Sequence, residues 1–319
     1  MQILFVTATR IGDAVLSTGL LAHLIERHPE ARLTIAAGPV AAPLFTEVPG
    51  LERLIVVEKR PFGAHWLALY GGVAARRWDM VVDLRGSALP WLLMAGERRA
   101  MGKGDPAEHR VRQLARLFGL DPPPGPCLWL SSGHERKAEA LVPKAGPVLA
   151  IGPAANWRGK QWRGERFAVL AQRLTAPDGP LPGARVAVLA AEHERAQAEP
   201  VLAAIPAERS IDLVGRTDLL TAAAVLRRTA LFVGNDTGLM HIAAASGVPT
   251  LGLFGPSPVA QYAPWGRDTA VVLAEDPPEA MFPDGFDHRT TDTLMDSLSV
   301  EAAEAAARRL WSRVASQAA

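Results

Sequence analysis

The sequence predicts an α/β protein of two halves, each built on a parallel β-sheet. Short apolar strands alternate with helical patterns along the chain, which is typical of βαβ units. The alternation starts twice, at Gln2–Thr7 and again at Val148–Gly152, and each time a polar loop leads into a helix. The 319 residues also exceed the usual size of one domain, so two domains of about 150 residues are expected.

In the first half, further strands are expected at Arg32–Ala37, Leu54–Val57 and Met80–Asp83, where apolar, β-prone residues form short runs. Helical periodicity predicts helices at Ala14–Glu26 and Val111–Phe118. Helices between strands are the usual connections of a parallel sheet.

The second half repeats this pattern. Its further strands are expected at Arg185–Leu189, Leu231–Val233 and Thr250–Phe254, and its helices at Glu165–Leu174, Glu192–Ala203, Leu219–Arg227 and Leu239–Ala245.

Two Pro/Gly-rich stretches separate the halves, the stiff segment Asp121–Pro126 and the cluster Pro143–Pro147. The expected domains are therefore 1–145 and 146–319. The sequence leaves open whether the final helix, 300–315, packs back on the N-terminal domain.

Composition excludes several classes of protein. The net charge of +1, from 34 basic and 33 acidic residues, argues against a general nucleic-acid binder. The single cysteine, Cys127, excludes an internal disulfide framework and a cysteine-based zinc cluster, and it fits a cytoplasmic protein. The first strand meets Arg10 and Asp13 too soon for a signal peptide. No apolar run approaches about 18 residues, so any membrane attachment is peripheral.

The most informative stretch, 231–255, is expected to form strand, turn, helix and strand. The polar turn at 235–238 is of the helix-capping type and opens onto the carboxyl edge of the sheet, where backbone N–H groups attract anions. The alternative is an ordinary capped helix between core strands. His241, one turn into the helix, favours the anion site.

The first loop, Thr7–Asp13, contains one glycine, Gly12, and therefore lacks the dinucleotide-binding fingerprint. It offers the carboxylate of Asp13 at the carboxyl edge of the first strand. The residue type also suits a helix cap. As a functional group, Asp13 is suited to take a proton from a hydroxyl nucleophile.

The corresponding loop of the second half, 152–162, carries Asn156, Arg158 and Lys160. A lysine there can neutralise a leaving diphosphate. The alternative is a solvated basic loop, which the flanking Trp157 and Trp162 disfavour because large aromatic side chains need a packing surface. The histidines are scattered and no metal-binding, nucleophile-elbow or Walker motif occurs, so no metal site is expected.

Three blocks, Arg10–Asp13, Trp157–Trp162 and Gly234–His241, resemble in order and spacing the signature of glycosyltransferase family 9, which contains the ADP-heptose:lipopolysaccharide heptosyltransferases. The resemblance spans nearly the whole chain. It implies the GT-B fold, in which two Rossmann-like domains with parallel sheets face each other across a cleft, with the donor on the second domain and the acceptor on the first. It also implies an inverting transfer that needs neither a metal nor another cofactor.

Residue by residue, the resemblance makes Asp13 the catalytic base and places Lys160 on the donor phosphates. It assigns the donor site to Asn156, Lys160, Glu194, Asp236, Thr237, Gly238 and His241. Asn156 stands where heptosyltransferases often have a hydroxyl side chain. Glu194 stands where the family often has a ribose-binding carboxylate, and Glu192 competes for that role.

The expected acceptor is an anionic glycolipid of the lipopolysaccharide core, which basic side chains suit. The candidates near strand ends in the first half are Arg10, Arg60, Arg85 and Arg110, and each is also compatible with an ordinary solvated charge. We therefore expect a cytoplasmic protein, and an acceptor of this kind is compatible with peripheral attachment at the inner face of the inner membrane.

Two other functions fit the same fold: a nucleotide-sugar epimerase, which needs no separate acceptor, and a non-catalytic nucleotide-sugar-binding protein. Retention of Asp13, Lys160 and Asp236 together disfavours the second. The sequence alone names neither the donor sugar and nucleotide, nor the acceptor, nor the oligomeric state.

Overall fold

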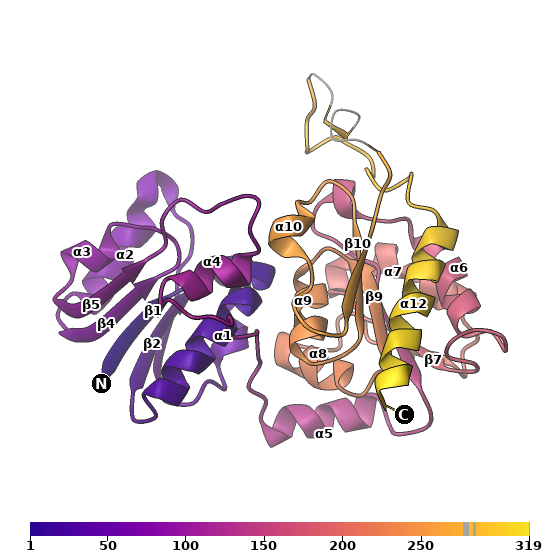
Figure 1. The fold of residues 1–319 in the computed structure, drawn as a ribbon, viewed down its shortest axis with the longest axis horizontal. Helices are drawn as coiled ribbons and strands as arrows, with labels where there is room; N and C mark the ends of the chain where they lie inside the picture. The colour runs from indigo at the N-terminus through magenta and orange to yellow at the C-terminus, as the bar shows by residue number, and fades with distance from the viewer. Residues whose placement is uncertain (277–280, 283–284, 319) are drawn as a thin grey trace. The chain divides into compact units, whose positions relative to one another are not determined.

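The computed structural model describes residues 1–276, 281–282 and 285–318, and it divides into two compact units, Met1–Ser131 and Ser132–Ala319 (Figure 1). Each unit is a parallel sheet with helices on both faces. The expected α/β class with two parallel sheets is therefore confirmed.

The first unit has a five-stranded sheet with the order β3-β2-β1-β4-β5. Its strands are β1 (Gln2–Val6), β2 (Arg32–Ala37), β3 (Leu51–Val56), β4 (Trp78–Asp83) and β5 (Ala95–Ala100). Its helical elements are α1 (Ile11–Arg27), η1 (Ala42–Phe45), η2 (Pro61–Gly63), α2 (Ala64–Val73), α3 (Leu89–Leu92) and α4 (Arg110–Arg116).

Successive side chains of β1 point to opposite faces of the sheet, so their contacts show which helices cover each face. Leu4 and Val6 point into a buried cluster that also contains Leu69 of α2 and Leu89 of α3, so α2 and α3 cover the same face of the sheet. Helix α1 packs against α4, and Figure 1 shows these two helices on the other side.

The second unit has a six-stranded sheet with the order β11-β10-β9-β6-β7-β8. Its strands are β6 (Val148–Gly152), β7 (Arg185–Val188), β8 (Ser210–Asp212), β9 (Leu231–Asn235), β10 (Thr250–Phe254) and β11 (Thr269–Leu273). Its helical elements are α5 (Ser132–Leu141), η3 (Arg158–Lys160), α6 (Gly164–Leu174), η4 (Glu192–Glu194), α7 (Arg195–Ala204), α8 (Leu219–Leu226), α9 (Gly238–Ala245), α10 (Val259–Tyr262) and α12 (Val300–Ala318).

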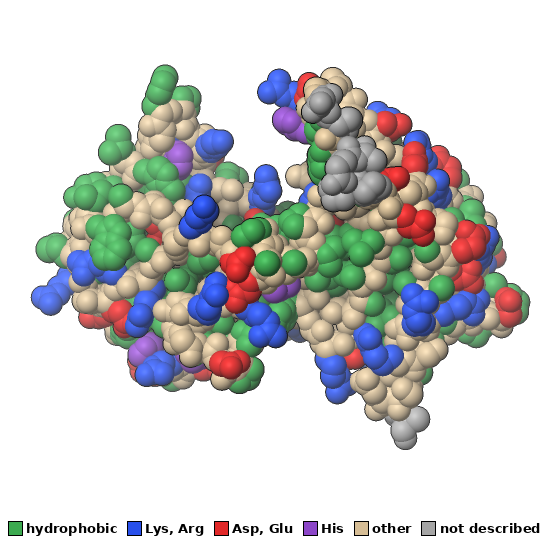
Figure 2. All heavy atoms as spheres, turned by 45° about the horizontal axis from the view of Figure 1, so that its top comes forward, with side chains coloured by type: hydrophobic (Ala, Val, Ile, Leu, Met, Phe, Trp, Pro, Cys, Tyr) green, Lys and Arg blue, Asp and Glu red, His purple; other side chains and the backbone are tan. Residues whose placement is uncertain are grey.

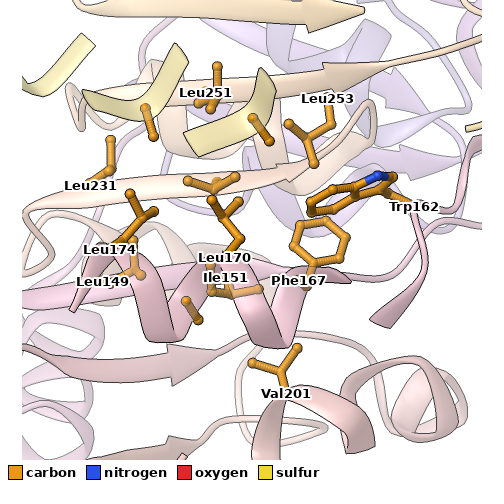
Figure 3. Close-up of a cluster of buried hydrophobic side chains, with 14 of the residues drawn as sticks. Leu149, Ile151, Trp162, Phe167, Leu170, Leu174, Val201, Leu231, Leu251 and Leu253 are labelled. Atoms are coloured by element: carbon orange, nitrogen blue, oxygen red, sulfur yellow. The ribbon is translucent and has the colours of Figure 1, made fainter. Parts of the chain in front are cut away.

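The largest described core of this unit lies between the sheet and helices α6, α7 and α12 (Figure 3). Ile151 of β6 and Leu253 of β10 meet Phe167 of α6 there, and the ring of Trp162 lies edge-on to Phe167. Leu310 of α12 belongs to the same cluster, so the final helix is packed within the second unit, against α6, β10 and β11.

The units divide at Ser131–Ser132, whereas the sequence places the boundary at 145/146. Two contacts explain the difference. The Pro-rich stretch lies against α1 at Gly19, where an added Cβ would come within 2.4 Å of the Pro124 carbonyl oxygen, and the Cys127 N–H donates to Thr18 at 3.0 Å. Helix α5, which follows, packs on α8. The stretch therefore belongs to the first unit and α5 to the second.

Candidate functional site

Each sheet has a point where the strand order reverses, and ligands of open α/β sheets bind outside the carboxyl ends of the strands at such points. In the first unit this point lies between β1 and β4, and in the second unit between β6 and β9. The loops that follow these four strands therefore frame the two candidate sites.

Asp13 is the third residue of α1, directly after the short loop that follows β1. The N-cap position is occupied by Arg10, whose side chain makes no capping hydrogen bond. The interpretation of Asp13 as the helix cap is thus wrong, although a carboxylate in a first helical turn is favoured by the helix dipole. Asp13 lies half-buried at the β1/β4 switch point.

Lys160, Asp236 and His241 lie together at the β6/β9 switch point. The Lys160 Nζ lies 2.7 Å from Asp236 Oδ2, and the His241 Nε2 lies 3.9 Å from Asp236 Oδ1. The Asp236 and His241 side chains are 6% and 4% exposed, whereas Lys160 is 28% exposed. A buried carboxylate thus holds a lysine whose side chain is partly exposed.

The turn between β9 and α9 differs in detail from the expected capping turn. Strand β9 extends through Asn235. Its side chain accepts from the backbone N–H of Trp162 at 3.1 Å and donates to the Pro153 carbonyl at 2.8 Å. Asn235 therefore ties the β9 end to the loop after β6. Thr237 is the N-cap of α9, and its side chain makes no capping bond to the helix that begins at Gly238. The first turn of α9 thus keeps the partial positive charge of a helix start.

The loop that carries Lys160 is held by the segment 285–298. The Trp157 indole donates to the His288 carbonyl at 2.8 Å, and the Leu294 N–H donates to the Gly159 carbonyl at 3.1 Å. Trp162 donates to the Leu298 carbonyl at 2.8 Å. The aromatic side chains flanking Lys160 therefore do have packing and hydrogen-bonding partners.

Ion pairs add to this attachment. The Arg158 Nε lies 2.9 Å from Asp292 Oδ1, and Arg163 pairs with Asp296 through two nitrogens, at 2.6 and 2.5 Å. Hydrogen bonds from Arg163 hold the pKa of Asp296 below its ordinary value, and those from the Thr293 N–H and Arg158 do the same for Asp292. We call segment 285–298 the clamp segment.

The remaining expected donor residues lie on loops after β6 and β7. Asn156 is exposed, in the loop after β6. One Glu194 oxygen accepts from the Ala191 N–H at 2.9 Å, so it is used within its own turn. The Glu192 carboxylate is 73% exposed and lies against Gly215, where an added Cβ would come within 2.1 Å of Oε2.

The four expected acceptor arginines all follow carboxyl ends of strands in the first unit: Arg10 after β1, Arg60 after β3, Arg85 after β4 and Arg110 after β5. The Arg85 guanidinium lies 4.8 Å above the Trp66 ring. Trp66 is a site residue that the sequence analysis missed, because only packing brings it under Arg85. This stacking fixes the direction of the charge.

The structure thus brings Lys160, Asp236 and His241 into contact, and it places Asp13 and the arginines at one edge of the other unit's sheet. Within the described ranges, no group of three His, Cys, Asp or Glu side chains is placed to hold a metal ion. None of the helices of that part of the chain is long and apolar enough to span a membrane.

Comparisons with known proteins extend this picture. Residues 74–284 match the model of glycosyltransferase family 9 (heptosyltransferase). The chain is 24% identical over 314 residues to lipooligosaccharide heptosyltransferase 2 of Haemophilus influenzae, covering 86% of this chain and 88% of that protein. It is 24% identical over 298 residues to lipopolysaccharide heptosyltransferase 2 of Salmonella typhimurium, covering 81% and 83%.

Solved structures agree on the fold. ADP-heptose lps heptosyltransferase II of E. coli superposes with a TM-score of 0.76 at 20% identity, over 98% of this chain and 99% of that one. The E. coli heptosyltransferase WaaC with ADP gives 0.71 at 19% identity, over 97% and 100%. The predicted GT-B fold is confirmed. Since the family model covers most of the chain, the protein belongs to glycosyltransferase family 9 and is a glycosyltransferase that uses a nucleotide-sugar donor.

Proposed function

We propose that this enzyme is an inverting heptosyltransferase that moves heptose from ADP-heptose to the lipopolysaccharide core without a metal ion. The Lys160–Asp236 pair at the β6/β9 switch point carries the proposal, because it holds a partly exposed lysine side chain where a donor diphosphate is expected. The choice of heptose as the transferred sugar is supported by the heptosyltransferase relatives and by the similar structure of the E. coli ADP-heptose lps heptosyltransferase II.

The reaction is a single displacement. An acceptor hydroxyl attacks the anomeric carbon of heptose as the bond from that carbon to the diphosphate oxygen breaks, and this inverts the centre. Asp13 takes the hydroxyl proton, because it is the carboxylate in the first turn of α1 at the switch point of the first unit. ADP leaves with the bonding electron pair.

Lys160 stabilises the charge that develops on the leaving diphosphate. Asp236 acts on Lys160 rather than on the phosphates, because a carboxylate next to a diphosphate would repel it. At 2.7 Å from Nζ, Asp236 fixes the direction of the ammonium group, and the paired ammonium offsets the negative charge of the carboxylate. The backbone at Thr237 and Gly238, at the start of α9, offers N–H groups to the same phosphates.

His241 positions the sugar or phosphate from within α9. Asn156 contacts the phosphates from the exposed part of the loop after β6. For the ribose we favour Glu192 over Glu194, because the Glu192 carboxylate is 73% exposed and its ion-pair partner, Arg195 Nε, lies 3.5 Å away, whereas a Glu194 oxygen already accepts from the Ala191 N–H at 2.9 Å. Loss of ADP-heptose affinity in Glu194→Gln but not in Glu192→Gln would reverse this order.

The acceptor binds to the first unit through Arg10, Arg60, Arg85 and Arg110, which follow the ends of four strands of one sheet. The core is anionic, and guanidinium groups suit phosphate and carboxylate in bidentate geometry. Because such an acceptor is lipid-linked, we also propose that the enzyme works at the inner face of the inner membrane.

Calorimetry with ADP-heptose and with GDP- and UDP-sugars tests the donor. We expect binding of ADP-heptose, and release of ADP only after acceptor is added. Conversion of the donor without acceptor would indicate an epimerase, and tight binding with no turnover under any acceptor would indicate a binding protein. Nuclear magnetic resonance of the product gives the anomeric configuration.

Metal removal is a separate test. We expect excess EDTA to leave the rate unchanged, because the charge on the diphosphate is met by Lys160 and by the start of α9. Full loss of activity in EDTA, restored by magnesium or manganese, would contradict the metal-independent mechanism.

A further inference from the structure

The first unit exposes an unusual number of large apolar side chains on two of its helices. Trp91 and Leu92 of α3 are 66% and 63% exposed, and the ring of Phe62 in η2 is fully exposed. We define the α2–α3 surface by six residues: Phe62, Leu67, Tyr70, Trp91, Leu92 and Met94. Helices α2 and α3 pack on the same buried cluster and so cover one face of the sheet. Exposed apolar side chains gathered on one face mark interaction sites.

Helix α2 lacks the polar outer face of an ordinary surface helix. Its sequence, Ala-His-Trp-Leu-Ala-Leu-Tyr-Gly-Gly-Val, contains no Asp, Glu, Lys or Arg. Leu69 and Val73 point into the core, in the cluster that includes Leu89 of α3. The opposite face presents Leu67 and Tyr70 to solvent, so α2 is apolar both inside and outside.

The backbone at the tip of this surface is strained in a way that displays an aromatic ring. Phe62 has φ 53° and Gly63 has φ 73°, so two successive residues are left-handed. Glycine adopts this conformation readily, whereas for a bulky side chain it is an outlier. Such strain persists mainly at functional positions, and here its visible result is an unburied Phe ring.

Positive charge flanks the apolar side chains. Lys59 and Arg60 come directly before Pro61–Gly63, and Arg77 is exposed just after α2. Figure 2 shows hydrophobic side chains exposed on the first unit with Lys and Arg side chains among them. The segment 58–99 contains seven Lys and Arg and four Asp and Glu, one of the latter being the buried Asp83. The whole chain, by contrast, is nearly neutral.

We propose that the α2–α3 surface docks on an anionic phospholipid bilayer. Phe, Trp and Tyr next to Lys and Arg are the combination that favours the region between lipid headgroups and acyl chains. A second copy of the chain is less suited, because two such surfaces would bring their basic residues together.

The position of the surface is consistent with a lipid-linked acceptor. Phe62 follows the carboxyl end of β3, the sheet edge from which the loops that lead to Asp13 and Arg60 also start. Met94, whose carbonyl accepts from the Trp78 N–H at 2.8 Å, lies at the opposite edge, where β4 begins. A bilayer that contacts Phe62 would therefore lie beside Arg60, one of the residues proposed to bind the acceptor. In this respect the inference rests on the proposed function, although lipid binding itself is measured without donor or acceptor.

The test is co-sedimentation with vesicles of phosphatidylglycerol and phosphatidylethanolamine, compared with vesicles of phosphatidylcholine alone. We expect the full chain to bind the anionic vesicles and to lose at least about tenfold in partitioning in the triple variant Phe62→Ser/Trp91→Ser/Leu92→Ser. Arg77→Glu should lower binding roughly fivefold or more and weaken its salt dependence. The matched control, Val169→Ser/Leu273→Ser, removes exposed apolar side chains of the second unit and should bind as the original chain does.

The variants replace exposed residues, so their thermal unfolding should match that of the original chain. Equal binding of the triple variant and the original chain, or no preference for anionic vesicles, would overturn the proposal. Conversion of an oligomer to a monomer by the triple substitution, seen by light scattering without vesicle binding, would identify a self-association surface instead.

A transfer assay separates this inference from the proposed function. On a soluble, deacylated acceptor the triple variant should keep the original turnover, whereas on glycolipid embedded in vesicles it should lose rate in step with its partitioning. If no sugar nucleotide supports transfer by the original chain, the proposed function fails, and the vesicle experiment still decides the docking surface by itself.

Discussion

The loop after β1 and the loop after β6 occupy equivalent places in the two units but carry opposite chemistry. The first is short, and α1 starts at Ile11, so Asp13 is presented on a helix. The second runs from 153 to 163 before α6 begins, and it presents Lys160 on a 3₁₀ turn. One switch point therefore offers a carboxylate and the other a cation.

The two loops are also held differently. Asp13 is carried by α1, which is buried along most of its length. Lys160 is held by residues far away in the sequence. Asp236, in the turn after β9, forms an ion pair with it, and the clamp segment forms hydrogen bonds with the loop at Trp157 and Gly159. A duplicated fold thus provides two sites, and the length of one loop decides how much support the functional side chain requires.

The carboxylate should give the largest effect. We expect Asp13→Asn to lower turnover roughly a hundredfold or more while donor affinity, measured by calorimetry, stays unchanged. The amide keeps the size of the side chain but accepts no proton. Glu26→Gln, an exposed carboxylate in the last turn of the same helix, is the control and should be silent. Turnover near the original level in Asp13→Asn would remove it from the mechanism.

The cation should come next. Lys160→Ala should raise the barrier to transfer by about 2–4 kcal/mol and weaken donor binding less, because charge on the diphosphate grows toward the transition state. Arg158→Ala removes a neighbouring, more exposed cation of the same turn and should cost much less.

Asp236 offers a way to sharpen this result. Lys160→Ala leaves a buried carboxylate facing the donor, so the double variant Lys160→Ala/Asp236→Asn should recover donor affinity but not turnover. If the double variant binds donor as weakly as the single one, Asp236 contacts the donor itself rather than acting through Lys160.

The fold was predictable where strands are central. The runs at Arg32–Ala37, Val148–Gly152 and Thr250–Phe254 coincide with β2, β6 and β10, because strands buried on both faces must be apolar throughout. Strands β5, β8 and β11 were missed. All three are edge strands and partly exposed, and β5 and β8 also carry residues that a buried strand would not, at Ala95–Ala100 and Ser210–Asp212. Helix α2 was missed because it has no polar face to give a helical period.

The site was predictable where local pattern sets it. Lys160, Asp236 and His241 follow strand ends, and parallel topology brings such ends to one edge. Long-range packing is what the pattern lacks. Nothing local in 285–298 indicates that it holds Trp157, and nothing in Asn235 distinguishes a turn residue from a buried bridge between two loops.

His241 should give a smaller effect that depends on the replacement. His241 lies in α9, and its Nε2 is 3.9 Å from Asp236 Oδ1. We expect His241→Gln, which still donates a hydrogen bond, to keep more turnover than His241→Ala. Turnover and thermal unfolding should be measured together. If both variants keep full turnover and only stability falls, the histidine serves the core alone.

The clamp segment should give the smallest effect, and its pH dependence is its signature. Asp296→Asn removes the carboxylate that binds Arg163 twice, and because the pair is partly solvent-screened we expect the donor KM to rise no more than about fivefold, with turnover unchanged.

Arg163 holds the pKa of Asp296 below its ordinary value of 3.8, so the ionised carboxylate is favoured in the folded state. Its contribution to stability is present above pH 3.8 and is lost as the pH falls below that value through the lower folded pKa. The unfolding temperatures of the original chain and Asp296→Asn should therefore differ at pH 7 and become equal in acid. The control Glu199→Gln replaces an exposed carboxylate of α7 and should unfold at the same temperature as the original chain at both pH values. A difference between Asp296→Asn and the original chain that persists unchanged into acid would show that the loop is held by the backbone bonds of the clamp segment and not by this ion pair.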